Sequence, residues 1–190
     1  MSTAADDVAM RKKPAGATSS AGGQGAAARD VAIFAAGCFW GVQFYFDQVP
    51  GVVKTEVGYI GGRVNNPTYE QVCSHTTGHV EATKITYDPK KVSYQTLLKH
   101  FFRIHDPTQL NKQGPDIGDQ YRSAIFYLND EQKKTSEQAI KILNKSSNYN
   151  KPIVTTLEKA AKFWPAENYH QKYTQKTGLG ACHVDYAPLN

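Results

Sequence analysis

Apolar residues recur along this chain with two different periods, and together the two periods predict a series of strands and helices. Unbroken apolar runs predict buried strands, and apolar spacings of three or four predict helices that bury one face. The run VAIFAA from residue 31 predicts a strand, and residues 38–49 predict a helix that Pro50 and Gly51 end. The later predicted elements are strands over 52–59 and 80–88, a helix over 93–104 capped by Ser93, a strand over 121–128, a helix over 130–145, a strand over 152–158 and a short helix over 165–173.

The order of these elements indicates the fold class. The first six follow the order β-α-β-β-α-β, which is typical of the ferredoxin-like, split β-α-β fold. We therefore expect an α+β fold in which helices cover one face of an antiparallel or mixed sheet. Two long polar loops are expected, over 60–78 and 105–120, and the second has the length of a binding loop or of a solvated connector.

Composition limits the classes of protein to which the chain can belong. With 190 residues, of which 40% are hydrophobic, it suits one domain with a sizeable core. No apolar run approaches the roughly 20 residues that a membrane span needs, so no membrane is expected. The net charge of +5 is spread along the chain in short groups, which favours solvated surface over a nucleic-acid site.

The two ends of the chain differ from the middle. Residues 1–29 are rich in Ala, Gly and Ser without a periodic apolar face, which predicts a disordered tail. No apolar core follows their basic residues, so they do not read as a signal peptide. We expect a folded domain over 30–174 and a flexible tail over 175–190. A cytoplasmic location is the default expectation, and an organellar address in the N-terminal tail stays open.

Three cysteines, Cys38, Cys73 and Cys182, are too few and too odd in number for a disulfide framework. No pair has the C-x-x-C spacing of zinc sites. Cys73, His75 and His79 could form a metal cluster, but no fourth ligand has a recognisable spacing, so no metal is expected. Free thiols in a reducing compartment fit this pattern.

Cys38 lies in GCFWG, between the first predicted strand and the helix that follows. Unpaired N–H groups and the positive end of the helix dipole would favour its thiolate, which is the nucleophilic form. Phe39 and Trp40 would offer an apolar surface beside the sulfur. The alternative is a core cysteine packed with two core aromatic residues.

Glu81 is a carboxyl group within a strand that is otherwise rich in β-branched residues. It lies either on the solvent face or in an apolar pocket. In such a pocket its pKa would rise, and the carboxyl could carry a proton at neutral pH.

Five stretches, taken together and in order, resemble the A-type peptide methionine sulfoxide reductase family. They span residues 31 to about 174, and their number makes the resemblance far more specific than any one of them. The stretches are GCFWG (37–41), GYIGG (58–62), NPTYEQVCSHTTGHVEATKITYDP (66–89), HDPTQLNKQGPDIGDQYRSAIFY (105–127) and FWPAENYHQKY (163–173).

The resemblance implies a reaction and a set of site residues. Cys38 would attack the sulfur of a methionine-S-sulfoxide while Glu81 protonates the departing oxygen, leaving methionine and a Cys38 sulfenic acid. The other implied contacts are hydrogen bonds from Tyr69 and Tyr121 to that oxygen, enclosure of the methyl group by Phe39 and Trp40, orientation of the substrate by Asp116, and a place for His170 in the lining.

The resemblance also implies how the enzyme is recycled. Cys182, in the glycine-rich tail, would condense with the sulfenic acid to form a Cys38–Cys182 disulfide, which thioredoxin or a related dithiol protein would reduce. Cys73 would be a structural thiol. Direct reduction of the sulfenic acid by an external thiol stays open. A monomer without a cofactor is expected, and the alternative functions are a thiol peroxidase and a non-catalytic redox or metal module.

Overall fold

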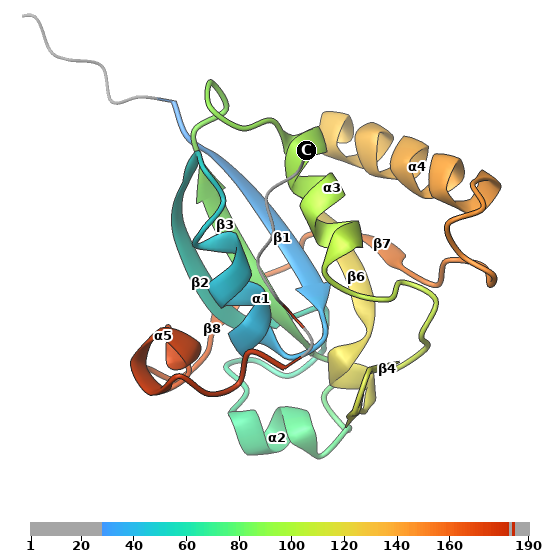
Figure 1. Ribbon diagram of the computed structural model, residues 1–190. Coiled ribbons are helices and arrows are strands. Elements are labelled where there is room, and N and C mark those ends of the chain that lie inside the picture. Colours follow the sequence, from blue (N-terminus) through green and yellow to red (C-terminus); the bar gives the residue numbers. More distant parts are fainter. Residues whose placement is uncertain (1–27, 183, 185–190) are drawn as a thin grey trace, which may run out of the picture.

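A six-stranded sheet with the order β7-β6-β1-β3-β2-β8 runs through the molecule (Figure 1). The computed structural model describes residues 28–182 and residue 184. The strands are β1 (Asp30–Ala36), β2 (Val52–Ile60), β3 (Val80–Tyr87), β6 (Ser123–Tyr127), β7 (Thr156–Lys159) and β8 (Trp164–Pro165).

The four central strands, in the order β6-β1-β3-β2, pair antiparallel throughout. This is the strand order of the ferredoxin-like fold, and it confirms the predicted α+β class. Strand β7 extends the sheet in parallel beside β6, and β8 extends the other edge antiparallel to β2, so the sheet is mixed.

Three helices cover one face of the sheet, as predicted: α1 (Phe39–Phe46), α3 (Tyr94–Arg103) and α4 (Asp130–Lys145) (Figure 1). Phe34 of β1 lies at the centre of this core, with the ring of Phe101 from α3 at 4.9 Å. The Ser93 side chain accepts a hydrogen bond from the Thr96 N–H at 3.1 Å, which confirms the predicted cap of α3.

The second face of the sheet is also covered, by the segment 160–163 that connects β7 to β8. Ala160 and Phe163 pack against a second apolar cluster that includes Ile33 and Ala35 of β1. Burial on both faces explains why the run VAIFAA is continuously apolar and does not alternate.

Both long loops contain short elements that the apolar pattern did not predict. The first holds α2 (Tyr69–Cys73), which begins with a complete capping box at Thr68 and Gln71. The second holds a small hairpin, β4 (Lys112–Gln113) with β5 (Asp116–Ile117), and a 3-10 turn over Asp119–Tyr121. Elements this short have no measurable period, so they are recognised from capping and turn residues.

The short helix predicted over 165–173 is wrong. Strand β8 and a series of turns occupy that stretch, and helix α5 (Tyr173–Thr177) starts only at its end. Ala166 N–H donates to the Val57 carbonyl at 2.9 Å, and the Gln171 side-chain amide pairs with both backbone groups of Val57. Hydrogen bonds to the edge of β2 therefore replace the bonds that a helix would make within this segment.

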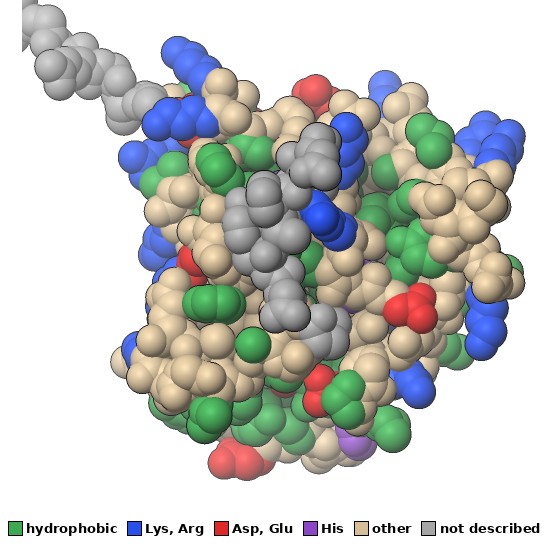
Figure 2. All heavy atoms as spheres, viewed as in Figure 1, with side chains coloured by type: hydrophobic (Ala, Val, Ile, Leu, Met, Phe, Trp, Pro, Cys, Tyr) green, Lys and Arg blue, Asp and Glu red, His purple; other side chains and the backbone are tan. Residues whose placement is uncertain are grey.

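The two predicted tails fall largely outside this description. Residues 1–27 are not described, so disorder over 1–29 stays a prediction. In the predicted C-terminal tail, α5 crosses residue 175, and the Val184 side chain is buried against the helical core. Among the described helices, none has the length and apolar character needed to cross a membrane. On the described surface that faces the viewer in Figure 2, most Lys and Arg side chains lie around the rim, a few lie near the centre, and they form no continuous patch.

Candidate active site

Cys38 lies where β1 ends and α1 begins, as the strand-to-helix interpretation predicted. Gly37 makes the turn with a φ of 87°, a conformation that favours glycine. Cys38 is the N-cap residue of α1, and the nearby backbone N–H of Trp40 acts to lower the pKa of its thiol. With 8% of its surface exposed, the thiol is buried beneath other groups of the site.

Cys182 is the group that contacts the Cys38 thiol. The two side chains are hydrogen-bonded, and all three cysteines of the chain are free thiols. This hydrogen bond, burial and the charge of Glu81 raise the pKa of Cys38, while the same bond lowers the pKa of Cys182. The expectation that Cys38 itself favours the thiolate is therefore wrong for this arrangement, because the contact favours ionisation of Cys182 over that of Cys38.

The backbone around Cys182 is held in place by local contacts. Cys182 has a φ of 53°, in the left-handed region that a non-glycine residue seldom occupies. Val184 N–H donates to the Ala181 carbonyl at 3.0 Å, and the Val184 side chain is buried. These contacts bring Cys182 to the start of α1.

Glu81 is buried, which excludes the solvent-face interpretation of its sequence position. The side chain is 2% exposed, and its Oε2 accepts a hydrogen bond from the Phe39 N–H at 3.0 Å. Burial raises the pKa of Glu81 to about 8; the Phe39 N–H opposes this shift, and the negative charge of Asp116 adds to it. The carboxyl therefore holds a proton at neutral pH, and it is bonded to the backbone of the residue that follows Cys38.

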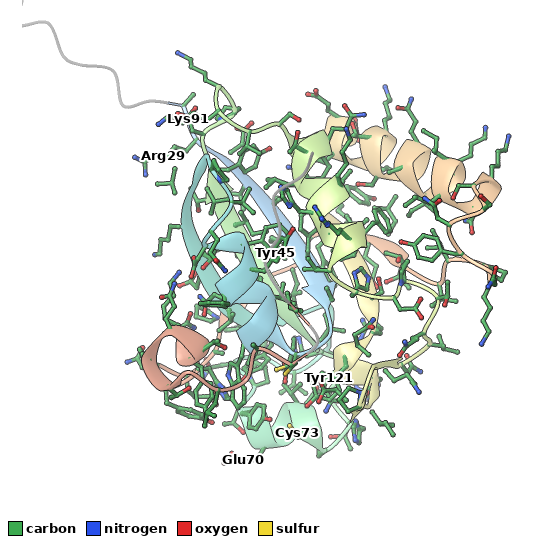
Figure 3. The ribbon with its side chains drawn as sticks, in the orientation of Figure 1. Arg29, Tyr45, Glu70, Cys73, Lys91 and Tyr121 are labelled. Atoms are coloured by element: carbon green, nitrogen blue, oxygen red, sulfur yellow. The ribbon has the colours of Figure 1, made fainter. Side chains whose placement is uncertain are left out.

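The phenols of Tyr69 and Tyr121 come from the two long loops. Tyr69 is the first residue of α2, and Tyr121 ends the 3-10 turn. Figure 3 places Tyr121 and Cys73, the last residue of α2, at the same end of the molecule. Burial and the nearby charge of Glu81 raise the pKa of both phenols, so they stay protonated as hydrogen-bond donors.

An aromatic wall forms the other side of this site. The Trp40 indole N–H donates to His170 Nδ1 at 2.9 Å, and Tyr173 stacks on the indole with ring centroids 3.8 Å apart. The Phe39 ring lies 5.1 Å from the His170 ring and is almost fully buried. Of the predicted apolar pair, Trp40 is the more exposed, and Phe39 packs beneath it.

The three side chains considered for a metal cluster have separate partners. His75 Nδ1 lies 2.9 Å from Asp119 Oδ1, His79 bonds to the backbone of Gly62 and Val64, and Cys73 bonds to the Tyr69 hydroxyl. Within the described part of the chain, no three His, Cys, Asp or Glu side chains are grouped as ligands for a metal ion.

Comparison with known proteins decides the family. The family model described as peptide methionine sulfoxide reductase matches residues 30–190. This chain belongs to the peptide methionine sulfoxide reductase family. Members of the family are oxidoreductases. The site described above, with its thiol, buried carboxyl and phenols, therefore lies in the fold of a methionine sulfoxide reductase.

Individual relatives agree with this assignment. The chain is 52% identical over 151 residues to the peptide methionine sulfoxide reductase MsrA of Geobacter metallireducens, covering 80% of this chain and 93% of the relative. It is 54% identical over 148 residues to MsrA of Methanosarcina acetivorans, covering 78% of this chain and 79% of the relative.

Solved structures of sulfoxide reductases share the fold. Reduced Mxr1 from Saccharomyces cerevisiae is 32% identical with a TM-score of 0.73, covering 84% of this chain and 93% of that one. Methionine sulfoxide reductase A of Corynebacterium diphtheriae is 32% identical with a TM-score of 0.71, covering 85% of both chains.

Two residues that sequence reasoning missed lie beneath this reductase site. Glu167 accepts hydrogen bonds from the Tyr69 N–H at 2.9 Å and from the Tyr59 hydroxyl at 2.8 Å. Both residues fall inside motifs that carried the resemblance, GYIGG and FWPAENYHQKY. Their spacing along the chain gave no sign that the side chains meet, because a pairing between distant segments has no sequence period.

Proposed function

We propose that this chain reduces methionine-S-sulfoxide to methionine with Cys38 as nucleophile and Glu81 as general acid. The observation that carries the proposal is a buried Glu81 held by the Phe39 N–H beside the turn that presents Cys38, where burial raises its pKa to about 8. A sulfoxide oxygen leaves only when it gains a proton, so an acid that keeps its proton at neutral pH is the group that the reaction needs.

The proposed first step balances without a cofactor. Glu81 donates its proton to the sulfoxide oxygen and takes the proton of the Cys38 thiol in return, while the Cys38 sulfur attacks the sulfoxide sulfur. The S–O bond of the substrate breaks, the oxygen passes to Cys38, and the products are methionine and Cys38 sulfenic acid. The sulfoxide is reduced by two electrons, and Cys38 is oxidised by two.

The remaining predicted residues would bind and orient the sulfoxide. Tyr69 and Tyr121 would donate hydrogen bonds to the oxygen as its charge grows. Trp40, with Phe39 beneath it, would enclose the methyl group, and His170 would hold the indole in place. Asp116 would help to orient the substrate and would keep Glu81 protonated.

Recycling would use Cys182. Its thiol already contacts Cys38, so condensation with the sulfenic acid would form the Cys38–Cys182 disulfide and release water. A thioredoxin-like dithiol protein would then reduce the disulfide. The yeast relative Mxr1, named above, has been solved in complex with Trx2.

We also propose that the protein acts as a cytoplasmic monomer on free or protein-bound methionine sulfoxide, repairs oxidised proteins, and needs no cofactor beyond an external thiol reductant. An organellar address within residues 1–29 would change only the compartment. The thiol peroxidase and the non-catalytic module are not favoured, since the matched family and the relatives named above are sulfoxide reductases.

Replacement of Cys182 by serine tests the recycling proposal. We expect Cys182→Ser to keep turnover of methionine-S-sulfoxide with excess dithiothreitol and to lose it with thioredoxin. Dithiothreitol can attack the sulfenic acid directly, whereas thioredoxin needs the disulfide. Cys73→Ser is the matched control and should behave as wild type with both reductants. Full thioredoxin-driven turnover by Cys182→Ser would contradict the role of Cys182.

Gly41 on α1 gives a second test of the same contact. A Cβ atom at this position would lie 2.4 Å from the Ala181 carbonyl oxygen, so Gly41→Ala should push Cys182 away from Cys38. We expect thioredoxin-driven turnover to fall roughly tenfold, because misplacement of reacting groups lowers the rate of their reaction. Dithiothreitol-driven turnover should change by less than about twofold, because alanine favours a helix over glycine by about 1 kcal/mol and α1 itself stays intact. An equal fall with both reductants would show that the substitution damages the site more widely.

A further inference from the structure

Glu167 connects two elements of the candidate site through its two oxygens. Oε1 accepts a hydrogen bond from the backbone N–H of Tyr69 at 2.9 Å. Oε2 accepts one from the hydroxyl of Tyr59 at 2.8 Å. Because Tyr69 is the first residue of α2, this carboxylate contacts the chain at the residue that bears one of the two phenols.

The Tyr59 end of this connection is fixed in the sheet. Tyr59 is fully buried in β2 and is the register partner of Glu81 on β3. The Phe39 ring packs on it with centroids 5.9 Å apart. Burial and the hydrogen bond to Glu167 raise the pKa of Tyr59, so its hydroxyl remains a donor.

His170 extends the connection to the aromatic wall. Its Nδ1 accepts the Trp40 indole N–H, so neutral His170 carries its proton on Nε2. That Nε2 is buried, has no hydrogen-bond partner among the described residues, and lies 3.9 Å from Glu167 Oε2. Burial lowers the pKa of His170, and the charge of Glu167 opposes this. The negative charge of Glu167 therefore faces the Nε2 proton of His170. With its proton on Nε2, His170 can accept the Trp40 indole N–H at Nδ1.

We propose that Glu167 is a positioning residue that fixes the Tyr69 phenol and the Trp40 indole relative to each other, and thereby sets which sulfoxide substituent the site accepts. Glu167 acts through these two residues and does not touch the substrate. The inference rests on the proposed function, because it assigns the phenol to the sulfoxide oxygen and the indole to the methyl group.

The test compares two substrates in three variants. We would measure kcat and KM with excess dithiothreitol for N-acetylmethionine-S-sulfoxide and for its S-ethyl analogue. For Glu167→Ala we expect kcat/KM for the methyl substrate to fall roughly ten- to a hundredfold, the loss that misplaced groups cause. The preference for methyl over ethyl should fall as well. Glu167→Gln should restore part of both, because its amide oxygen can accept from the Tyr69 N–H while its NH2 group donates to the Tyr59 hydroxyl oxygen. Glu70→Ala, an exposed carboxylate beside Tyr69, is the control and should match wild type.

A spectroscopic readout separates positioning from a general loss of structure. The chain has two tryptophans, so its NMR spectrum should contain two indole N–H signals. Glu167→Ala should move the Trp40 signal and leave that of Trp164 in place. Tyr59→Phe removes one hydroxyl and should shift the substrate preference in the same direction by a smaller factor, which keeps the test open if Glu167→Ala does not fold.

The outcomes distinguish this inference from the proposed function. If wild type does not reduce the methyl substrate, the proposed function fails. If wild type does so and the folded Glu167 and Tyr59 variants keep its substrate preference and Trp40 signal, only the positioning role of Glu167 is overturned. A fall in kcat/KM that is equal for both substrates would also overturn it, because a smaller fraction of intact enzyme reduces both rates alike.

Discussion

Turnover of methionine-S-sulfoxide should be lost completely in Cys38→Ser, whichever reductant is supplied. Sulfur can accept the oxygen and become a sulfenic acid, whereas a serine oxygen has no corresponding oxidation state. We expect the rate to fall by at least about 10⁴-fold, in the range known for removal of an enzyme nucleophile. The measurement is product formation with excess dithiothreitol, together with a melting curve to show that the variant is folded.

Cys73→Ser serves as the control for this substitution. Cys73 is a partly buried thiol on α2 that bonds to the Tyr69 hydroxyl, and serine can make a similar bond. It should retain most of the wild-type rate. If Cys38→Ser also keeps its activity, Cys38 belongs to the core and the reaction uses another group.

The second large effect is expected at Glu81. Glu81→Gln should lower kcat/KM by about 10² to 10⁴-fold, because the amide cannot donate the proton that the departing oxygen requires. Glu56→Gln is the matched control, since Glu56 is a partly exposed strand carboxylate that pairs with Lys84 on the sheet surface. That control should keep the wild-type rate.

The dependence of kcat/KM on pH gives a further test of the role of Glu81. The pKa of Glu81 is raised from 4.5 to about 8, mainly by burial, so the carboxyl is protonated at neutral pH and loses its proton as the pH rises through about 8. Wild-type kcat/KM should fall above that pH, and the residual activity of Glu81→Gln should lack this alkaline limb. An unchanged alkaline limb in Glu81→Gln would mean that another group titrates.

The same shift affects stability. A carboxyl whose pKa is higher in the folded state binds its proton more tightly there, and this adds to the free energy of unfolding. That added stability is complete below about pH 4.5 and is lost as the pH rises through about 8. Above pH 8 the wild-type protein must keep a charge in an apolar pocket. Glu81→Gln should therefore lose less melting temperature between pH 7 and 9 than wild type does.

Local sequence features predicted the elements that have a period or a cap. The continuous apolar run of β1, the spacing in α1 and α3 and the Ser93 cap all appear in the structure. The predicted helix over 165–173 failed because its backbone partners lie in β2, far away along the chain. Helix α2 and the β4–β5 hairpin are too short to show a period.

For the candidate site, too, the sequence identified some features and the tertiary structure determined others. The motifs singled out Cys38, Glu81, Tyr69 and Tyr121, and the fold brings the loops and strands that bear them to one end of the sheet. The motifs could not assign a protonation state to any of them. The expectation of a Cys38 thiolate considered only its own helix and omitted Cys182, which changes the pKa of both thiols.

The sequence by itself determined the order of the elements, the strand-to-helix position of Cys38 and the resemblance to the reductase family. These depend on residues that are neighbours along the chain. The tertiary structure decided that Glu81 is buried, that Cys182 contacts Cys38, and that Glu167 and His170 lie behind the phenol and the indole. A pKa depends on burial and on nearby groups, and here those groups can lie as far apart along the chain as Cys38 and Cys182.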